Sequence, residues 1–341
     1  MSAPPNPSHI MQIGAGFWAS KTLLTAIEFG VFTLLAERPM TGRELEASLE
    51  MHPRATFDFL DTLVALGFLE REGDGEAARY SNAPDTDLFL DRNKPEYMGG
   101  ILEMFNARLY RYWDDLGVAL RTGMPQNEIK ETGQSIFAEL YKDEAGLEGF
   151  MNAMSGISAG NFAAFARTFD FSGYTTMCDV GGATGQLCTL VARENAHLKL
   201  TTFDLPPVAP IASRHIHAAG LDDRIDVVSG DFFADPLPAA DVITMGMILH
   251  DWNLEKKMQL IRAAHDALPD GGCLVAIENI IDDARRENAF GLMMSLNMLI
   301  EFGDAFDFTA SDFQTWCTEA GFSRFETIPL GGPAAAVVAY K

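Results

Sequence analysis

The sequence predicts an α/β protein in which a doubly wound sheet domain follows a mostly helical N-terminal part. The main observation is the alternation of strand-like and helical segments from Tyr174 onward, the chain order of a sheet with helices on both faces. The predicted helices begin at Gln186, Val208 and Leu254. The predicted strands are "TTMCDV", "LKLTTFDL", "RIDVVSG", "ADVITMGMIL" and "CLVAIENI".

The last segment, "RFETIPLGGPAAAVVAYK", completes this sheet. It contains two β-type runs joined by a Gly-Gly-Pro turn, so we expect a hairpin that closes one sheet edge. The 341 residues leave room for a second domain, because a single domain commonly takes about 100–200 residues.

The N-terminal part shows the element order of a winged helix: helix, turn, helix, hairpin. Apolar residues recur at helical spacing from Met11 to about Arg38, and Thr41 with Glu44 three residues later is typical of a capping box. Two short strand-like runs then flank "GDGE". Acids stand where a DNA-reading helix and wing present cations, so we expect dimer or scaffold packing here.

The pattern remains helical from Tyr97 to about Phe169, with a break at 123–126. We therefore expect three segments. They are a winged-helix-like dimerisation domain (1–95), a helical connector and lid (96–170) and the sheet domain (171–341).

Composition narrows the classes of partner. Lys and Arg total 25 against 48 Asp and Glu, and the net charge of −23 repels nucleic acid and anionic membranes, so neither is an expected partner. The four cysteines stand singly, without zinc or disulfide spacing. Without a signal-peptide pattern or a long apolar run, a cytoplasmic location is expected.

The candidate binding site begins at "DVGGATG", where a glycine turn follows a strand and precedes a helix. Such a turn lets backbone approach a ligand closely, but alone it does not separate a dinucleotide from a nucleoside. The next strand ends in Asp204, whose carboxylate suits both hydroxyls of a ribose. The third ends in Asp231 and Phe232, which suit an adenine amino group and ring. Three consecutive strand ends thus describe an adenosine.

Four motifs, "DVGGATG", "FDLPPV", "GDFF" and "MILHDWNLEKKMQLIRAAHDALPDGG", resemble those of class I S-adenosylmethionine-dependent O-methyltransferases of the caffeate, isoflavone and hydroxyindole type. Bacterial relatives in this family tailor aromatic natural products in secondary metabolism. The resemblance spans almost the whole chain. It implies a Rossmann-like seven-stranded domain that binds S-adenosylmethionine, preceded by a winged-helix dimerisation domain that forms a homodimer.

The resemblance also assigns residues. The methionine part of the cofactor would lie against Gly181 and Gly185, the ribose against Asp204 and the adjacent Leu205, the adenine against Asp231 and Phe232, and the adenosyl group between Met247 and Trp252. Ala183 stands where relatives often carry glycine; its methyl group is tolerable if the backbone keeps a negative φ.

His250 matches the general base of this family. Its predicted place, at the carboxyl end of the fourth strand, agrees with that role, because open α/β sheets bind ligands there and an imidazole titrates near neutral pH. In the family two acids bracket the histidine. Glu278 matches the first, and Asp307, in "DFT" where relatives have "ERT", is the candidate for the second, with a side chain one methylene shorter. No metal is expected.

The acceptor, a small aromatic molecule with a phenolic or enolic hydroxyl, is expected in an apolar pocket. Methionines adapt to planar apolar ligands, and Asn297 adds one polar group. The predicted pocket residues are Phe105, Phe150, Met151, Met154, Met294, Asn297 and Met298.

Other interpretations remain open at this stage. The same scaffold serves N- or C-methyl transfer to a heteroaromatic or enolisable substrate. An iron-assisted methyltransferase would need a second histidine beside His250 and Asp251. The glycine turn alone fits a nicotinamide dehydrogenase, and the N-terminal part alone fits a winged-helix regulator.

Overall fold

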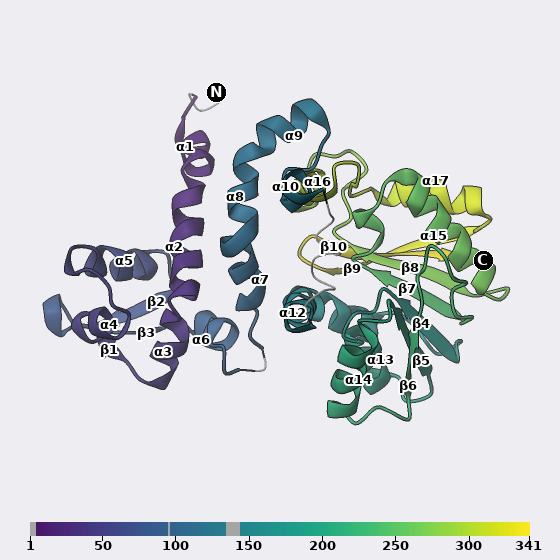
Figure 1. Cartoon of the computed structure of the whole chain (residues 1–341), viewed down its shortest axis with the longest axis horizontal. Coiled ribbons are helices and arrows are strands. Elements are labelled where there is room, and N and C mark those ends of the chain that lie inside the picture. Colours follow the sequence, from purple (N-terminus) through teal and green to yellow (C-terminus); the bar gives the residue numbers. More distant parts are fainter. Residues whose placement is uncertain (1–4, 95, 134–143) are drawn as a thin grey trace. The chain divides into compact units, whose positions relative to one another are not determined.

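The structure, a computed structural model, describes residues 5–94, 96–133 and 144–341 (Figure 1). Residues 134–143, part of the predicted helical connector, lie outside these ranges. The chain divides into two compact units, Met1–Arg111 and Tyr112–Lys341. The three segments expected from the sequence stay a prediction beside this division.

The first unit is a helical domain with a small sheet. Thr41 and Glu44 form the predicted capping box at the start of α4. The apolar stretch from Met11 to Arg38 is helical as predicted but forms three helices, because the chain turns at Ala15 and again at Gly30, which has φ +72°. The elements are α1 Ser8–Gly14, α2 Gly16–Glu28, α3 Val31–Glu37, β1 Met40–Thr41, α4 Gly42–Ser48, α5 Pro53–Ala65, β2 Leu69–Glu72, β3 Arg79–Asn82, α6 Pro84–Leu90 and α7 Gly99–Met104.

Strand β3 pairs antiparallel with both β1 and β2, so the three strands form the wing expected around "GDGE". Apolar side chains of α2, α3, α4 and α5 close one core above it, and Phe32, Leu45 and Leu60 are fully buried. This burial explains the helical spacing seen in the sequence.

Helices continue after α7, as predicted. A π-helical stretch covers Phe105–Leu109, and α9 ends at Thr122 with Gly123 as its C-cap, at the predicted break. The helices of this stretch are α8 Tyr110–Tyr112, α9 Leu116–Thr122, α10 Glu128–Thr132 and α12 Glu144–Thr168.

The second unit contains a seven-stranded sheet in the order β6-β5-β4-β7-β8-β10-β9. Strands β4 to β8 are parallel, and the C-terminal hairpin adds β10 and β9 antiparallel at the β8 edge, as predicted. The strands are β4 Thr176–Val180, β5 Lys199–Asp204, β6 Ile225–Ser229, β7 Val242–Gly246, β8 Cys273–Glu278, β9 Arg324–Gly331 and β10 Ala334–Tyr340.

Helices cover both faces of this sheet, each over its own apolar cluster. One face packs against α12, α13 and α14, the other against α15 and α17, which matches the predicted doubly wound fold. The helices are α13 Gln186–Glu194, α14 Ala209–Ala218, α15 Leu254–Ala267, α16 Ala289–Phe302 and α17 Ala310–Ala320. The carboxyl ends of the parallel strands therefore meet at one edge, where the predicted site residues lie.

No single helix in the described ranges is both long and apolar enough to cross a membrane. The bent pair Ser8–Glu28 and Val31–Glu37 meets that criterion only when its two parts are counted together.

Candidate active site

The glycine turn after β4 has the tight backbone that the sequence predicts. Gly181 and Gly185 have φ of +73° and +74°, a region that glycine enters without steric cost. A Cβ on Gly181 would lie 2.3 Å from Cδ1 of Ile248, so both the conformation and the space require glycine. Gly185 is the N-cap of α13, so the turn leads directly into the N-terminus of that helix.

Ala183 departs from the expectation of a negative φ: its φ is +47°. Two contacts hold it there. Its N–H donates to Oδ2 of Asp204 at 2.9 Å, and its methyl group packs with Leu205 against the apolar cluster under α14. The turn therefore retains backbone strain where relatives often have glycine.

Asp204, at the end of β5, organises the turn. Its Oδ1 accepts from the Leu205 N–H at 2.7 Å while Oδ2 holds Ala183, and each oxygen keeps a lone pair for a ligand hydroxyl. Burial raises the pKa of Asp204, although both hydrogen bonds oppose this. Burial also raises the pKa of Asp179 to about 7, although Thr244 donates to its Oδ1 at 2.8 Å. Two acids, Asp179 and Asp204, therefore lie at the carboxyl ends of β4 and β5.

Three aromatic side chains, Phe232, Phe233 and Trp252, pack together near the glycine turn. The rings of Phe232 and Phe233 stand edge-on to Trp252, with centroids 6.0 and 4.6 Å away. Nε1 of Trp252 is buried without a hydrogen-bond partner among the described residues, and Met247 has φ +56°. Asp231 is exposed, and its Oδ1 accepts from the Phe233 N–H. The predicted adenine residues therefore lie together.

His250 sits in the turn Leu249–Asp251 after β7 and is only 5% exposed. Its Nδ1 lies 3.4 Å from Oδ1 of Asp307, and its Nε2 lies 3.4 Å from Oδ1 of Asp251. Oε1 of Glu278 accepts from the backbone N–H groups of Ile248 and Leu249, which fixes this turn to the end of β8. The shorter side chain of Asp307 thus lies within ion-pair distance of His250, although among the described residues Nδ1 and both Asp307 oxygens have no hydrogen-bond partner.

Charge dominates the chemistry of this cluster. Burial lowers the pKa of His250, but the negative charges of Glu278, Asp251 and Asp307 outweigh it and raise the pKa to about 10. Burial in turn raises the pKa of Glu278 to about 7 and that of Asp251 to about 6. One nitrogen or oxygen atom from each of His250, Glu278 and Asp307 lies within 4.8 Å of the others, and among the described residues no second histidine joins them.

The predicted acceptor residues fall into different settings. Asn297 on α16 accepts at Oδ1 from Nε1 of Trp113 at 3.0 Å; an indole N–H only donates, so the amide NH₂ of Asn297 points elsewhere. Met151 is buried in the apolar cluster under α14 and Met298 in the sheet domain, whereas Met154 and Met294 are half-buried. Phe150 lies on α12 and Phe105 in the first unit. Their role in binding stays a prediction.

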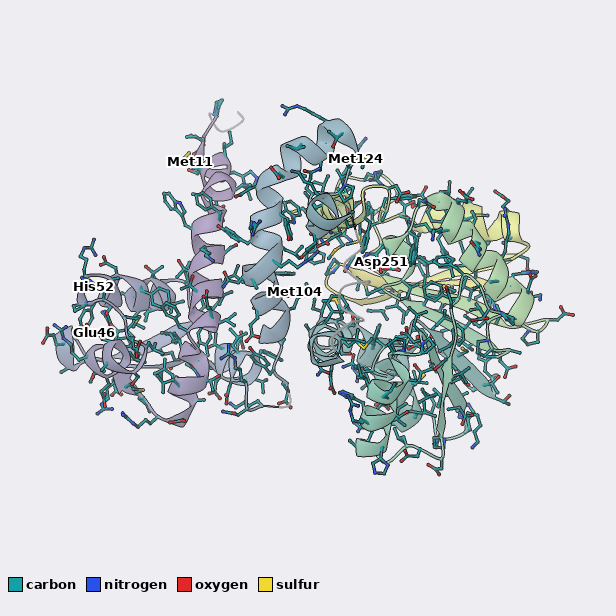
Figure 2. All side chains as sticks on the ribbon, in the orientation of Figure 1. Met11, Glu46, His52, Met104, Met124 and Asp251 are labelled. Carbon is teal, nitrogen blue, oxygen red and sulfur yellow. The ribbon has the colours of Figure 1, made fainter. Side chains whose placement is uncertain are left out.

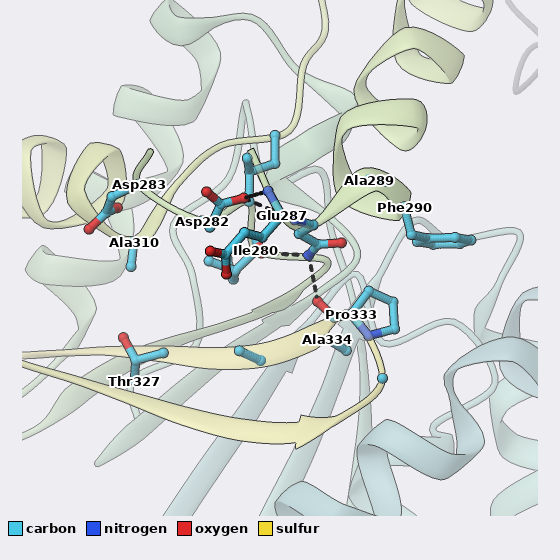
Figure 3. A pocket seen from close by; sticks show the side chains of 14 residues that line it. Ile280, Asp282, Asp283, Glu287, Ala289, Phe290, Ala310, Thr327, Pro333 and Ala334 are labelled. Carbon is cyan, nitrogen blue, oxygen red and sulfur yellow. Dashed lines mark hydrogen bonds between the residues drawn. The ribbon is translucent and has the colours of Figure 1, made fainter. Parts of the chain in front are cut away.

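A surface cavity of about 660 Å³ lies between the segment after β8 and the β9–β10 hairpin (Figure 3). None of the predicted site residues lines it. Asp282, on its wall, accepts the backbone N–H groups of Asn288, Arg286 and Glu287, which lower its pKa to about 2. Asn288 also donates to the Pro333 carbonyl. These bonds fix the start of α16, the helix that carries Asn297.

Comparison with known proteins decides the family. The model of the O-methyltransferase domain matches residues 113–323, and that of the O-methyltransferase dimerisation domain matches residues 11–92. The chain belongs to the O-methyltransferase family. It is an S-adenosylmethionine-dependent O-methyltransferase with a dimerisation domain.

Individual relatives agree with this assignment. The tetracenomycin polyketide synthesis 8-O-methyl transferase of Streptomyces glaucescens is 38% identical over 98% of this chain and 97% of its own. An N,N-dimethyltransferase of Streptomyces rimosus is 34% identical over 92% of this chain and 90% of its own. The structure of human N-acetylserotonin methyltransferase with S-adenosylmethionine has a TM-score of 0.90 at 30% identity, covering 100% of this chain and 99% of that one.

The residues present fit the cofactor of this O-methyltransferase. The turn at Gly181, which has the left-handed backbone that suits glycine, and Nε1 of Trp252, which has no hydrogen-bond partner among the described residues, lie at one edge of the sheet. Asp204 is the acid at that edge whose oxygens retain accepting capacity. We therefore keep Gly181, Asp204 and Trp252 as the core of the predicted cofactor site.

Sequence reasoning missed Lys257. It is fully buried, and its ammonium donates to the carbonyls of Trp252 and Phe306. The helical pattern contained the signal, because Lys257 shares one face of α15 with Leu260, Ile261 and Ala264, all buried. A charge on an apolar helix face needs a partner, and here the partners lie around His250.

The strained φ of Ala183 predicts a stabilising substitution. Ala183→Gly relieves the steric cost of the left-handed conformation, about 1–2 kcal/mol. The glycine also raises the conformational entropy of the unfolded chain, which offsets part of this gain. We therefore expect the free energy of unfolding to rise by about 0.5–1 kcal/mol. Urea denaturation measures it, with Ala263→Gly in α15 as the destabilising control. A loss of stability in Ala183→Gly would contradict the strain.

Asp204 predicts a loss of cofactor affinity. Because hydrogen bonds to a charged group contribute about 1.5–3 kcal/mol, Asp204→Ala weakens S-adenosylmethionine binding by roughly 10–100-fold in calorimetry. Asp204→Asn, which keeps one oxygen and the shape, falls in between, and exposed Asp226→Ala serves as control. Unchanged affinity in both Asp204 variants would show that Asp204 does not bind S-adenosylmethionine.

Proposed function

We propose that this enzyme methylates a phenolic or enolic hydroxyl of a small planar aromatic acceptor, with His250 as the general base. The observation that carries the proposal is the position of His250: a buried imidazole after the carboxyl end of β7, 3.4 Å from Asp307 and two residues after Ile248, whose side chain lies against Gly181. A base placed there lies within reach of a hydroxyl held over the cofactor site.

When bound, S-adenosylmethionine supplies a methyl group on a good leaving group, so the protein mainly provides orientation and proton removal. His250 takes the hydroxyl proton, and Glu278, Asp251 and Asp307 stabilise the imidazolium. The base has to be neutral when the acceptor arrives. A cation bound beside the glycine turn would lower the pKa of His250 by repulsion, and the imidazole would then release its proton to solvent before the acceptor reacts.

The acceptor class follows from the relatives and the pocket. The Streptomyces glaucescens relative acts in polyketide synthesis, and another, 32% identical over 96% of this chain, is a 3-hydroxy-5-methyl-1-naphthoate 3-O-methyltransferase. Half-buried Met154 and Met294 with the NH₂ of Asn297 suit a fused aromatic ring that carries a carbonyl or hydroxyl. We therefore favour a polycyclic aromatic intermediate of secondary metabolism.

A second candidate is methyl transfer to nitrogen. The Streptomyces rimosus relative is an N,N-dimethyltransferase, and it matches this chain over most of both lengths. An amine also loses a proton to a base after methylation, so the cluster around His250 serves either acceptor atom.

The deciding experiment uses S-adenosylmethionine with a deuterated methyl group and a panel of polycyclic phenols, heteroaromatic amines and enolisable ketones. Mass spectrometry with fragmentation locates the label. A labelled methoxy group supports the proposal, and a label on nitrogen replaces it with the second candidate. Binding of the cofactor without any labelled product rejects the acceptor class.

His250→Ala predicts a loss of turnover without a loss of cofactor affinity. General-base removal lowers kcat by about 10²-fold or more, most for weakly acidic phenols that hold their proton tightly. Asp307→Asn removes a negative charge 3.4 Å from the imidazole and thereby lowers the pKa of His250. The acid limb of kcat then moves to lower pH, by about one unit. Undiminished kcat in His250→Ala rules out this base.

We also propose that the chain forms a homodimer through its N-terminal unit. Large apolar side chains of α1 and α2 are exposed, among them Ile13 at 69% and Trp18 at 68%, and they lie within the matched dimerisation domain (residues 11–92). Figure 2 labels Met11, 64% exposed, on the same helix α1. An exposed patch of this kind marks an interaction surface.

Trp18→Glu predicts dissociation, because a carboxylate in an apolar interface loses its hydration. Sedimentation velocity of the full chain gives the wild type as a dimer and the variant as a monomer at micromolar concentration. Leu254→Glu, the same kind of change at an exposed site of the sheet domain, leaves the dimer intact. If the Trp18→Glu variant is still a dimer, the dimer interface does not include Trp18.

A further inference from the structure

Lys257 connects the two segments that bring His250 and Asp307 together. Its ammonium donates to the carbonyl of Trp252, two residues after His250, and at 2.8 Å to the carbonyl of Phe306, the residue before Asp307. Both acceptors are backbone atoms, so the bonds fix the course of each segment whatever the neighbouring side chains do.

The surroundings of Lys257 make this connection specific. The side chain is fully buried, and its ammonium lies 3.6 Å from the ring centroid of Phe306 and 5.9 Å from that of Phe308. Residues 303–309, the loop that carries Asp307, contain no Lys or Arg. The cation beside this loop comes instead from α15.

We propose that Lys257 is a positioning residue for methyl transfer: it draws the Phe306–Asp307 segment toward the His250 turn and so makes up for the shorter side chain of Asp307. The proposal rests on the proposed role of His250 as the base. Two other hydrogen bonds hold the same loop: Asn253 donates to Asp304, and Ser295 Oγ accepts from the Asp307 N–H. Neither of them involves the Phe306 carbonyl, which accepts from Lys257.

Charge gives Lys257 a second effect on His250. Acids on every neighbouring element face the imidazole: Glu278 from β8, Asp251 from its own turn and Asp307 from the loop, with Glu301 of α16 beside Asp251. Lys257 brings a positive charge that interacts with Glu278, Asp307 and Asp251. Burial lowers its pKa to about 8, so it remains mostly charged at neutral pH. Removing this charge stabilises the imidazolium further and moves the acid limb of kcat to higher pH.

The test compares Lys257→Met, Lys257→Gln and the double variant Lys257→Met/Asp307→Glu, with exposed Lys199→Met as control. Each is measured with the fastest-reacting phenol of the labelling panel. We expect Lys257→Met to lower kcat tenfold or more, to shift the acid limb upward by half a pH unit or more, and to keep S-adenosylmethionine affinity within twofold. The longer glutamate in the double variant restores kcat at least threefold.

A merely structural lysine gives a different pattern: kcat falls without a shift of the limb, and glutamate does not restore it. Either result overturns the proposal, as does a kcat within twofold of wild type. If Lys257→Met does not fold by circular dichroism, Lys257→Gln takes its place, because it keeps a donor without the charge; an unshifted limb then overturns the proposal.

Parallel measurement of His250→Ala separates two failures. Full turnover in His250→Ala rejects the base itself, whereas slow turnover there with a normal Lys257→Met rejects only the positioning role. If no phenol reacts, the titration of the His250 imidazole in ¹⁵N-histidine-labelled protein is the readout. We expect its midpoint to move to higher pH by half a unit or more in Lys257→Met, because a nearby positive charge is removed; an unshifted midpoint overturns the proposal.

Discussion

The structure at the sheet edge depends on three carboxylates that surround one buried imidazole. Glu278 and Asp307 are buried and Asp251 is partly buried, and a charge that leaves water is costly unless an opposite charge compensates it. His250 and Lys257 supply that compensation. The same requirement explains why the histidine turn, the end of β8 and the loop before α17 lie together, because each brings one member of the cluster.

This balance also links catalysis to stability. The pKa of His250 in the folded chain lies above its ordinary value of 6.5, so the stabilisation from its imidazolium is complete below that pH and is lost as pH rises through about 10. A base held this way is a strong proton acceptor once its own proton has left. The acids therefore stabilise the fold and the product of proton transfer by the same interaction.

Much of the fold was predictable because it depends on local patterns. The strand and helix succession, the capping box at Thr41 and the final hairpin follow from periodicity and turn residues. The partner of Asn297 was not predictable, because Trp113 lies 184 positions away in the chain. The distance between Asp307 and His250 was not predictable either, because it depends on the loop that Lys257 binds at the Phe306 carbonyl. The φ of Ala183 depends on the Asp204 carboxylate of another strand.

The central claim is that the three surrounding acids hold His250 as a cation in the free protein. An NMR titration of ¹⁵N-histidine-labelled protein, with His250 assigned through the His250→Ala variant, tests it directly. The account predicts that the imidazolium of His250 persists above pH 8, since its pKa is about 10. Deprotonation near the ordinary value of 6.5 would contradict it, because the acids would then exert no net hold on the imidazole.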